Sequence, residues 1–313
     1  MSSKNSGYWV AGVFISLVGA ICFSTKAIFV KLAYRDSDVD AITLLALRML
    51  FSLPFFVGSA WFYSRKTDNV RFTSKQWMAV AFVGVLGYYV SSLLDFWGLK
   101  YVSAGIERLV LFVYPTFVLL LSALWLRQKV TGIQWLAVAI TYFGLVIAFI
   151  SESQIQISGD FYFGSLLILA CAFTYASYIV GSGKLIPMVG AMKFNSYAMS
   201  FAAAAVLVHF FLFGQHSLFN LPMIVYVYSF LMAIVSTVIP SYLVSASIKR
   251  LGANNTAIIA SIGPVSTIVQ AYYLLGETIS LLQALGTILI LMGILLITWR
   301  RNPVPVNDVE PVK

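Results

Sequence analysis

The sequence predicts an all-α integral membrane protein whose ten transmembrane helices form two inverted five-helix repeats. Of its 313 residues, 60% are apolar and 10% are charged, whereas about a quarter of the residues in soluble proteins are charged. A bilayer core about 30 Å thick needs about 20 apolar residues per helix, and nearly the whole chain divides into runs of that length. The third observation is an internal repeat, which predicts how these runs are arranged.

The second half of the chain repeats the first at an offset of 149 residues. At this offset Pro115 aligns with Pro264 and Gly144 with Gly293, without a gap between them. Proline restricts the backbone and glycine frees it, so their shared positions within apolar runs are more informative than shared leucines. We therefore expect one membrane unit that has been duplicated.

Each expected helix is an apolar run that ends near a charged residue or a glycine. The runs, in order, are residues 9–33, 41–63, 77–98, 103–126, 133–150, 161–183, 191–213, 222–248, 253–275 and 281–299. The fifth and tenth runs contain no charged residue, which favours a peripheral place. The runs group into two units, residues 8–150 and 158–300. Residues 302–313 hold three prolines and no apolar period, so we expect a disordered cytoplasmic tail.

Lys and Arg residues predict the orientation, because cytoplasmic loops hold the excess of these residues. Fourteen of the 20 lie in the N-terminus, the even-numbered connections and the C-terminal tail, whereas the odd-numbered connections hold Arg35, Lys100 and, at a helix end, Lys31. Both termini are therefore expected in the cytoplasm. Since each unit has an odd number of helices, the second enters from the opposite face, as in many secondary transporters with a substrate site near the midplane.

Charge and motifs exclude several other classes of protein. A net charge of +9 would suggest a nucleic-acid partner in a soluble protein. Here the basic residues lie in short loops as orientation signals, so no nucleic-acid partner is expected. The chain has no P-loop and no nucleophile motif with triad partners, which argues against ATP drive and against an enzyme. Cys22 and Cys171 lie in apolar runs without metal-type spacing, so neither a metal site nor a cofactor is expected.

Specific residues resemble a known transporter family. The first helix contains the stretch Gly19-Ala20-Ile21-Cys22-Phe23-Ser24-Thr25-Lys26, which is similar to the start of the EamA-type branch of the drug/metabolite transporter superfamily. The chain departs from that family's pattern at Cys22-Phe23, where a Trp-Gly pair often stands, and at Gln128, where an acidic residue is usual. Glu277 keeps the acidic residue in the second unit. The resemblance covers residues 8–300.

The resemblance implies a central cavity lined by helices one to four and six to nine, with helices five and ten peripheral. It also implies a secondary transporter working by alternating access, specifically an exporter of small metabolites such as amino acids or related compounds across the inner membrane. The expected partners are a small-molecule substrate, the lipid bilayer and a second copy of the chain in a homodimer. Two alternatives stay open: a facilitated exchanger of anionic metabolites, and, from another class, a non-transporting membrane scaffold or a membrane enzyme.

Charged residues within the expected helices all belong to the first unit and to its outer half. They are Lys26, Arg48, Asp95, Glu107 and Arg108. A charge at a helix centre costs about 2.5–3.5 kcal/mol on insertion scales, and it persists only with a partner, a cavity or a function. The second unit has alanine where Lys26 and Arg108 stand. The charged layer is therefore specific to one unit.

Two interpretations of this charged layer stay open. In the functional one, Lys26, Arg48 and Arg108 bind substrate, because three cations against two carboxylates leave one positive charge for a carboxylate or phosphate. Asp95 and Glu107 then carry proton coupling. In the structural one, Arg48 pairs with Asp95, and Lys26 or Arg108 pairs with Glu107, in a closed network. Glu107 and Arg108 start about 100° apart on a helix, so we expect one to face the cavity and the other to snorkel outward.

Polar and aromatic side chains of the same helices are predicted to complete the substrate site. Their hydroxyl groups and rings offer hydrogen bonds and stacking to a small solute. The candidates are Ser24, Thr25, Tyr88, Tyr89 and Tyr114 in the first half and Thr174, Tyr175, Tyr178, Asn195, Ser236, Thr237, Ser241 and Gln270 in the second. Of these, Ser24, Tyr89, Tyr114 and Tyr175 are selected as substrate-binding residues.

Prolines mark the predicted hinges of the transport cycle. Pro115 and the pair Gly263 and Pro264 lie about midway along the fourth and ninth expected helices. Proline removes a helical hydrogen bond and kinks the helix, which a membrane protein tolerates beside a cavity. We expect the two halves to rock about these positions.

Overall fold

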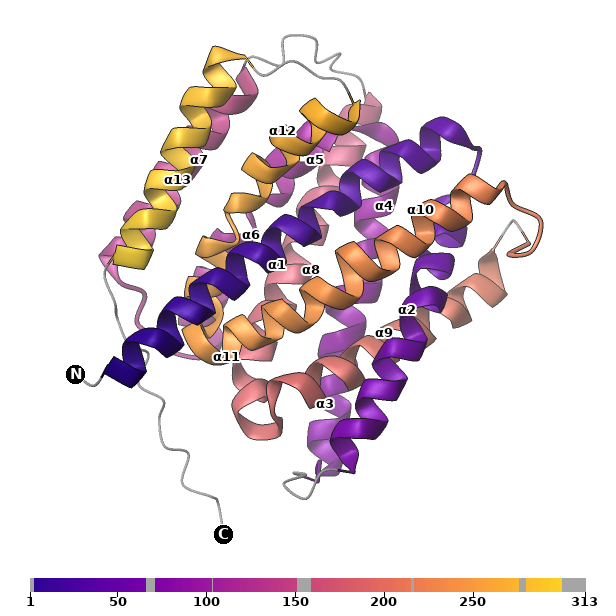
Figure 1. The fold of residues 1–313 in the computed structure, drawn as a ribbon, viewed down its shortest axis with the longest axis horizontal. Helices are drawn as coiled ribbons and strands as arrows, with labels where there is room; N and C mark the ends of the chain where they lie inside the picture. Colours follow the sequence, from indigo (N-terminus) through magenta and orange to yellow (C-terminus); the bar gives the residue numbers. More distant parts are fainter. Residues whose placement is uncertain are drawn as a thin grey trace.

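The computed structural model describes residues 3–65, 71–102, 104–150, 159–214, 217–275 and 280–299, and these residues are almost entirely helical (Figure 1). The elements in order are α1 (Ser3–Asp36), α2 (Ala41–Ser64), α3 (Ser74–Gly84), η1 (Val85–Val90), α4 (Ser91–Tyr101), α5 (Ala104–Leu111), α6 (Tyr114–Trp125), α7 (Gly132–Ile150), α8 (Gly159–Val189), α9 (Ala191–Phe213), α10 (Met223–Ala233), η2 (Ile234–Val238), α11 (Ile239–Ile259), α12 (Ile262–Leu275) and α13 (Leu281–Trp299). Glu277 and the tail at 302–313 lie outside the described residues.

Long apolar helices dominate the described part of the chain, as the sequence predicts. Six helical stretches are long and apolar enough to cross a bilayer, namely Gly7–Asp36, Ala41–Ser64, Ser74–Tyr101, Asp160–Val189, Ala191–Phe213 and Met223–Ile259. Three shorter apolar helices are Tyr114–Trp125, Gly132–Ile147 and Ala284–Leu296. Large apolar side chains such as Phe82 and Phe211 are exposed on the outside of the bundle. An all-helical chain of this kind suits a bilayer, because helices satisfy their own backbone hydrogen bonds.

Helices of the two halves are interrupted at matching places. The π-helical segments η1 and η2 begin at Val85 and Ile234, which are 149 residues apart. The chain also breaks between α5 and α6, just before Pro115, and between α11 and α12, just before Pro264. Proline cannot supply the N–H that would continue the helix through such a point. The helices therefore break at the predicted prolines, and their action as hinges stays a prediction.

The boundary between the eighth and ninth expected helices is a sharp bend inside α11. Gly252 has φ 79° and ψ 167° there, outside the helical region. A positive φ is readily adopted by glycine, which has no Cβ atom to clash with the preceding carbonyl group. The bend divides α11 into one part that continues η2 and another that leads to α12.

Helices α7 and α13 form a two-fold symmetric pair at one edge of the molecule (Figure 1). A Cβ atom at Gly144 would lie 2.6 Å from the carbonyl oxygen of Gly286, and one at Gly293 would lie 2.8 Å from that of Ala137. Both glycines are needed because the backbones approach so closely. Gly286 and Gly293 are the repeat counterparts of Ala137 and Gly144. Each contact is thus the image of the other, and the two helices run in opposite directions.

The remaining helices of each half pack mainly on helices of the other half. Helix α1 lies along α11, and its counterpart α8 lies along α4. Helix α2 lies along α9. Side chains that point inward from α1, α2 and α4 therefore meet elements of the second half in the centre of the bundle.

Candidate functional site

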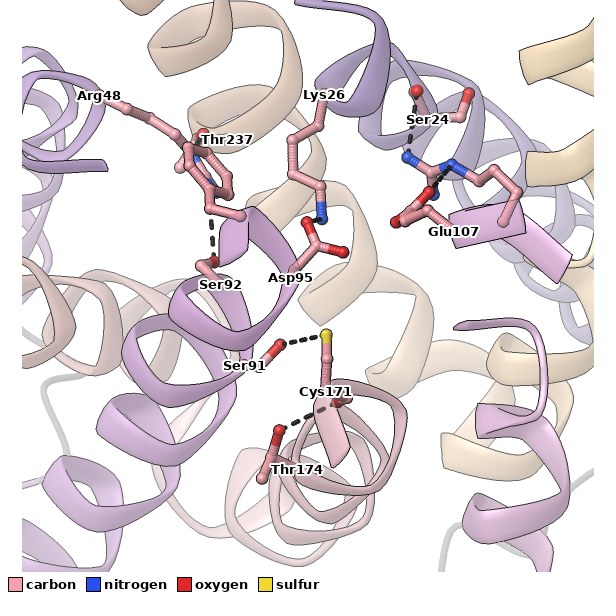
Figure 2. A network of polar contacts seen from close by, with 12 residues as sticks. Ser24, Lys26, Arg48, Ser91, Ser92, Asp95, Glu107, Cys171, Thr174 and Thr237 are labelled. Carbon is pink, nitrogen blue, oxygen red and sulfur yellow. Dashed lines mark hydrogen bonds and ion pairs between the residues drawn. The ribbon is translucent and has the colours of Figure 1, made fainter. Parts of the chain in front are cut away.

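All five charged residues predicted from the sequence are buried in the bundle, and Figure 2 labels Lys26, Arg48, Asp95 and Glu107. Lys26 comes from α1, Arg48 from α2, Asp95 from α4, and Glu107 and Arg108 from α5. None of these residues is more than 4% exposed. We call them the ionic cluster.

Lys26 and Asp95 form the shortest ion pair of the ionic cluster. The Lys26 Nζ atom lies 2.6 Å from Asp95 Oδ2 and 5.0 Å from the centre of the Phe23 ring. The Asp95 carboxyl group is also near enough to the Glu107 carboxyl group to interact with it electrostatically. The expected pairing of Arg48 with Asp95 is therefore wrong, because the ammonium group on α1 occupies that carboxylate.

Glu107 and Arg108 bind each other although they are neighbours in the sequence. Arg108 Nε lies 3.0 Å from Glu107 Oε2, and Arg108 Nη2 donates a 3.2 Å hydrogen bond to the carbonyl oxygen of Ser24. The expectation that one of the two would snorkel outward is wrong. The arginine side chain is long enough to fold back across the 100° between them, and it links α5 to α1.

Arg48 is held by neutral groups only. Its Nε donates a 2.6 Å hydrogen bond to Thr237 Oγ1, and its Nη1 donates a weaker 3.4 Å bond to Ser92 Oγ. The Phe96 ring centre lies 5.5 Å from its Cζ atom. The remaining nitrogen, Nη2, has no hydrogen-bond partner among the described residues. Figure 2 shows Arg48 beside Thr237 and Ser92, to one side of the Lys26 and Asp95 pair.

The π-helical segments position the residues that face the ionic cluster. In η2, the Thr237 hydroxyl group donates a 2.8 Å hydrogen bond to the Met232 carbonyl oxygen, five residues earlier, and accepts the bond from Arg48. Its counterpart 149 residues earlier is Tyr88 in η1, which is buried with its ring centre 4.9 Å from that of Tyr178. π-Helical turns are rare and are frequently found at functional sites.

Two of the predicted tyrosines belong to an aromatic cluster next to the ionic cluster. Tyr175 stacks on Phe23 with ring centres 5.7 Å apart and meets Tyr114 edge-on at 5.3 Å. Tyr178 lies 6.0 Å from Tyr175 on the same helix. The Tyr114 hydroxyl group donates a 3.1 Å bond to the carbonyl oxygen of Ala257, in the second half. The cluster therefore joins both halves beside the charges.

Tyr89 lies apart from this cluster, and Tyr88 takes the inward position. Tyr89 is half-buried, and its hydroxyl group lies 2.9 Å from His209 Nδ1. A signal for the correct choice was present in the sequence. Tyr88 precedes Asp95 by seven residues, about two helical turns, so both side chains share a face.

Ser24 is a polar junction between the two halves. Its hydroxyl group donates a 2.7 Å bond to Ile21 and accepts a 3.3 Å bond from Gln270 Nε2 of α12, while its carbonyl oxygen binds Arg108. Gln270 Oε1 has no hydrogen-bond partner among the described residues. Gln270 joins the site through this bond to the first half, which sequence alone does not reveal.

No group of three or more metal-binding side chains gathers in the described ranges. The charged, hydroxyl and aromatic groups of the buried site can bind an anion and can hold a proton on a carboxyl group.

Comparisons with known proteins identify the family of this chain. The model of the EamA-like transporter family matches residues 10–150 and 162–299. YcbK, an uncharacterised transporter of Bacillus subtilis, is 35% identical over 283 residues, which cover 88% of this chain and 89% of that protein. YicL, an uncharacterised inner membrane transporter of Salmonella typhimurium, is 22% identical over 92% of this chain and 95% of its own length.

A solved crystal structure shares the fold. It superposes with a TM-score of 0.75 over 93% of this chain and 97% of the other, at 18% sequence identity. At this level of sequence identity, the match shows a common fold and nothing about function.

Proposed function

The chain belongs to the EamA-like transporter family, and from this premise we propose that it is a secondary transporter that exports small metabolites by alternating access. Family membership and the apolar helices make it a multi-pass membrane transporter. The proposal adds the mode of transport, the outward direction and a substrate class of amino acids or related compounds. It also places the chain in the inner membrane, as the name of the Salmonella relative states for that protein.

The proposed architecture is ten membrane-crossing helices in two inverted units, residues 8–150 and 158–300. The symmetric, antiparallel contact of α7 with α13 supports it. A two-fold axis that relates two antiparallel membrane-crossing helices lies in the membrane plane, which is the relation between inverted repeats. The matched positions of η1 and η2 also support it. Reporter fusions at both ends of the chain test the proposed cytoplasmic termini.

One observation carries the proposal: the ionic cluster is buried where the two halves meet. Arg48 of the first half binds Thr237 of the second, and Arg108 lies beside the bond between Ser24 and Gln270. Rocking of one half against the other breaks these bonds and opens the cluster. A buried charge in a membrane protein commonly marks a substrate or ion pathway.

Proton coupling is assigned to Asp95 and Glu107. Asp95 is paired with Lys26 at 2.6 Å and Glu107 with Arg108 at 3.0 Å, and the two carboxyl groups are near enough to interact electrostatically. Two neighbouring carboxyl groups in a medium of low dielectric constant favour a state in which one of them is protonated, because two adjacent negative charges repel each other. Proton uptake raises the net charge of the ionic cluster from +1 to +2, which changes its affinity for an anion.

The test is flux through purified protein in proteoliposomes. A thermal-shift screen over amino acids, nucleosides, organic acids and sugar phosphates first identifies a ligand, since binding stabilises the folded state by mass action. Flux of that ligand is expected to differ between matched and opposed pH gradients. Asp95→Asn and Glu107→Gln are expected to remove the difference. Equal flux in both gradients would contradict proton coupling.

A second candidate function is favoured by Arg48, whose charge has no carboxylate partner in the described part of the chain. It is facilitated exchange of an anionic metabolite, in which no proton is needed. Counterflow without any gradient, lost in Lys26→Ala and Arg48→Gln, would favour exchange. If no ligand that binds is transported, the remaining alternative is a non-transporting membrane scaffold. A homodimer is proposed separately and is tested by light scattering of the detergent-solubilised protein.

A further inference from the structure

Arg48 differs from the two other buried cations in its partners. Lys26 lies 2.6 Å from Asp95, and Arg108 lies 3.0 Å from Glu107. Arg48 takes part in no ion pair among the described residues, although its side chain is fully buried. Since the cluster holds three cations and two carboxylates, the unmatched positive charge resides on Arg48.

The surroundings of Arg48 do not neutralise this charge. Hydroxyl groups of Thr237 and Ser92 and the ring of Phe96 contact the guanidinium group. Asp95 is near enough to interact electrostatically with Arg48, but its carboxylate is bound to Lys26. A buried cation without a counter-ion is unfavourable in a medium of low dielectric constant. Its presence therefore requires a compensating function.

The geometry points to a carboxylate as the missing counter-ion, and we propose that Arg48 is the subsite that binds the carboxylate group of a monoanionic substrate. The Nε atom is engaged by Thr237, Nη1 makes one long bond to Ser92, and Nη2 has no partner among the described residues. The edge formed by Nη1 and Nη2 can bind a planar carboxylate with two parallel hydrogen bonds. One negative charge neutralises the ionic cluster, whereas a phosphate dianion would overcompensate it.

Binding at this edge takes place next to the contact between the halves. Thr237 belongs to η2 of the second half, and its bond to the Arg48 Nε atom joins the two halves beside the subsite. A carboxylate on Nη1 and Nη2 competes only with the long Ser92 bond to Nη1 and leaves the Thr237 bond in place. This inference rests on the proposed transport function and names its substrate class.

Stability without ligand gives the first test. Replacing an unneutralised buried charge by an apolar side chain of similar length is often stabilising, whereas removing one member of a buried pair is destabilising. Arg48→Met is therefore expected to raise the melting temperature of the purified protein by about 2–4 °C. Lys26→Met and Asp95→Asn, which break a pair, are expected to lower it. If Arg48→Met lowers the melting temperature as much as Lys26→Met does, Arg48 stabilises the fold, and the inference is overturned.

Ligand binding gives the second test. The probes are α-amino acids, 2-hydroxy acids and 2-oxo acids, each compared with its primary amide, in thermal-shift assays. At least one acid is expected to stabilise the wild type while its amide does not. The shift is expected to disappear in Arg48→Gln and to remain in Lys100→Gln, which removes an exposed cation at the end of α4. An acid that still shifts Arg48→Gln by the wild-type amount, or a panel in which no acid acts, would overturn the inference.

Flux separates failure of this inference from failure of the proposed function. If Arg48→Gln in proteoliposomes transports an uncharged amide as fast as the wild type, while the acid is not transported, Arg48 selects the carboxylate. If the wild type and Arg48→Gln transport the acid equally well, the proposed transport function is supported and the assignment of Arg48 as the carboxylate subsite is wrong. If the wild type transports nothing, the proposed function itself falls.

Discussion

The two halves of the chain share a backbone and differ in their buried charges. The segments η1 and η2 begin 149 residues apart, and the bounds of α7 and α13 differ by the same number. Yet every charged residue of the ionic cluster has an uncharged, buried counterpart 149 or 150 residues later. The pairs are Lys26 and Ala176, Arg48 and Ala198, Asp95 and Val244, Glu107 and Thr256, and Arg108 and Ala257.

The second half has its own buried polar network, made of neutral groups. Asn195 Nδ2 donates a 3.0 Å bond to Ser241 Oγ, and Ser245 Oγ donates a 3.3 Å bond to Asn195 Oδ1. Ser247 and Thr256 are joined by a 3.0 Å bond between their hydroxyl groups. Neutral groups that satisfy each other are much less costly to bury than charges.

The two halves therefore share their fold but not the buried charged groups that could bind a solute. The common backbone provides two packing units that meet in the symmetric contact of α7 with α13. The ionic cluster belongs to one unit, and the corresponding buried positions of the other unit are neutral.

Introducing a charge at a neutral, buried position of the second half should have the largest effect. Ala176 is fully buried at the position that corresponds to Lys26. Ala176→Lys buries an ammonium group without a carboxylate counterpart and is expected to destabilise the protein by roughly 5 kcal/mol or more. The measurement is thermal unfolding of the solubilised protein. Ala176→Met is the control for size alone, at about 1–3 kcal/mol. Equal stability of the two variants would mean that the second half tolerates charge.

Breaking the ion pair of the charged half should come next. Lys26→Met leaves the Asp95 carboxylate without its cation and is expected to lower stability by about 3–5 kcal/mol. The double variant Lys26→Met with Asp95→Asn is expected to recover much of this loss, because no single charge is left alone. Additive losses in thermal unfolding would contradict a direct pair.

The equivalent positions in the two π-helical segments should respond differently. Thr237→Val removes the acceptor of the Arg48 Nε bond and is expected to cost about 1.5–3 kcal/mol, as for hydrogen bonds to charged groups. Tyr88→Phe is expected to cost about 1 kcal/mol or less, because the Tyr88 hydroxyl group has no partner of ordinary hydrogen-bond geometry in the described ranges. Thermal unfolding of both variants compares them. A larger cost for Tyr88→Phe would reverse the proposed roles of η1 and η2.

The symmetric contact of α7 with α13 should show the smallest difference between the halves. Gly144→Leu and Gly293→Leu each insert a side chain between close backbones and are expected to cost about 1–3 kcal/mol. The two costs should agree, because the contacts are images of each other. Denaturation of both variants measures this. A loss confined to one of them would show that the contact is not symmetric in energy.

Much of the fold follows from the sequence, because apolar length and proline positions act locally. The helices expected at 133–150 and 281–299 have nearly the observed bounds, Gly132–Ile150 and Leu281–Trp299. The π-helical segments were not predicted, since they contain no proline and their extra residue depends on packing between the halves. Their sequences are as apolar as the helices around them.

The composition of the candidate site was predicted, and its pairing was predicted in part: the expected pair of Arg108 with Glu107 is present, whereas the expected pair of Arg48 with Asp95 is not. Membership of the ionic cluster follows from the free energy of placing a charge in a bilayer. The choice of Lys26 over Arg48 as the partner of Asp95 depends on the relative positions of α1, α2 and α4, which no local pattern encodes. The inward position of Tyr88 could have been read from its spacing to Asp95, whereas the role of Gln270 required the structure.

The central claim is that the ionic cluster opens to each face of the membrane in turn. Ser92, which binds Arg48, can be changed to cysteine in a chain whose Cys22 and Cys171 are replaced by serine. A membrane-impermeant maleimide is then applied to right-side-out and to inside-out vesicles. Alternating access predicts labelling from both faces, with a transported ligand slowing one rate and speeding the other. Labelling from one face only, or from neither, would contradict the account.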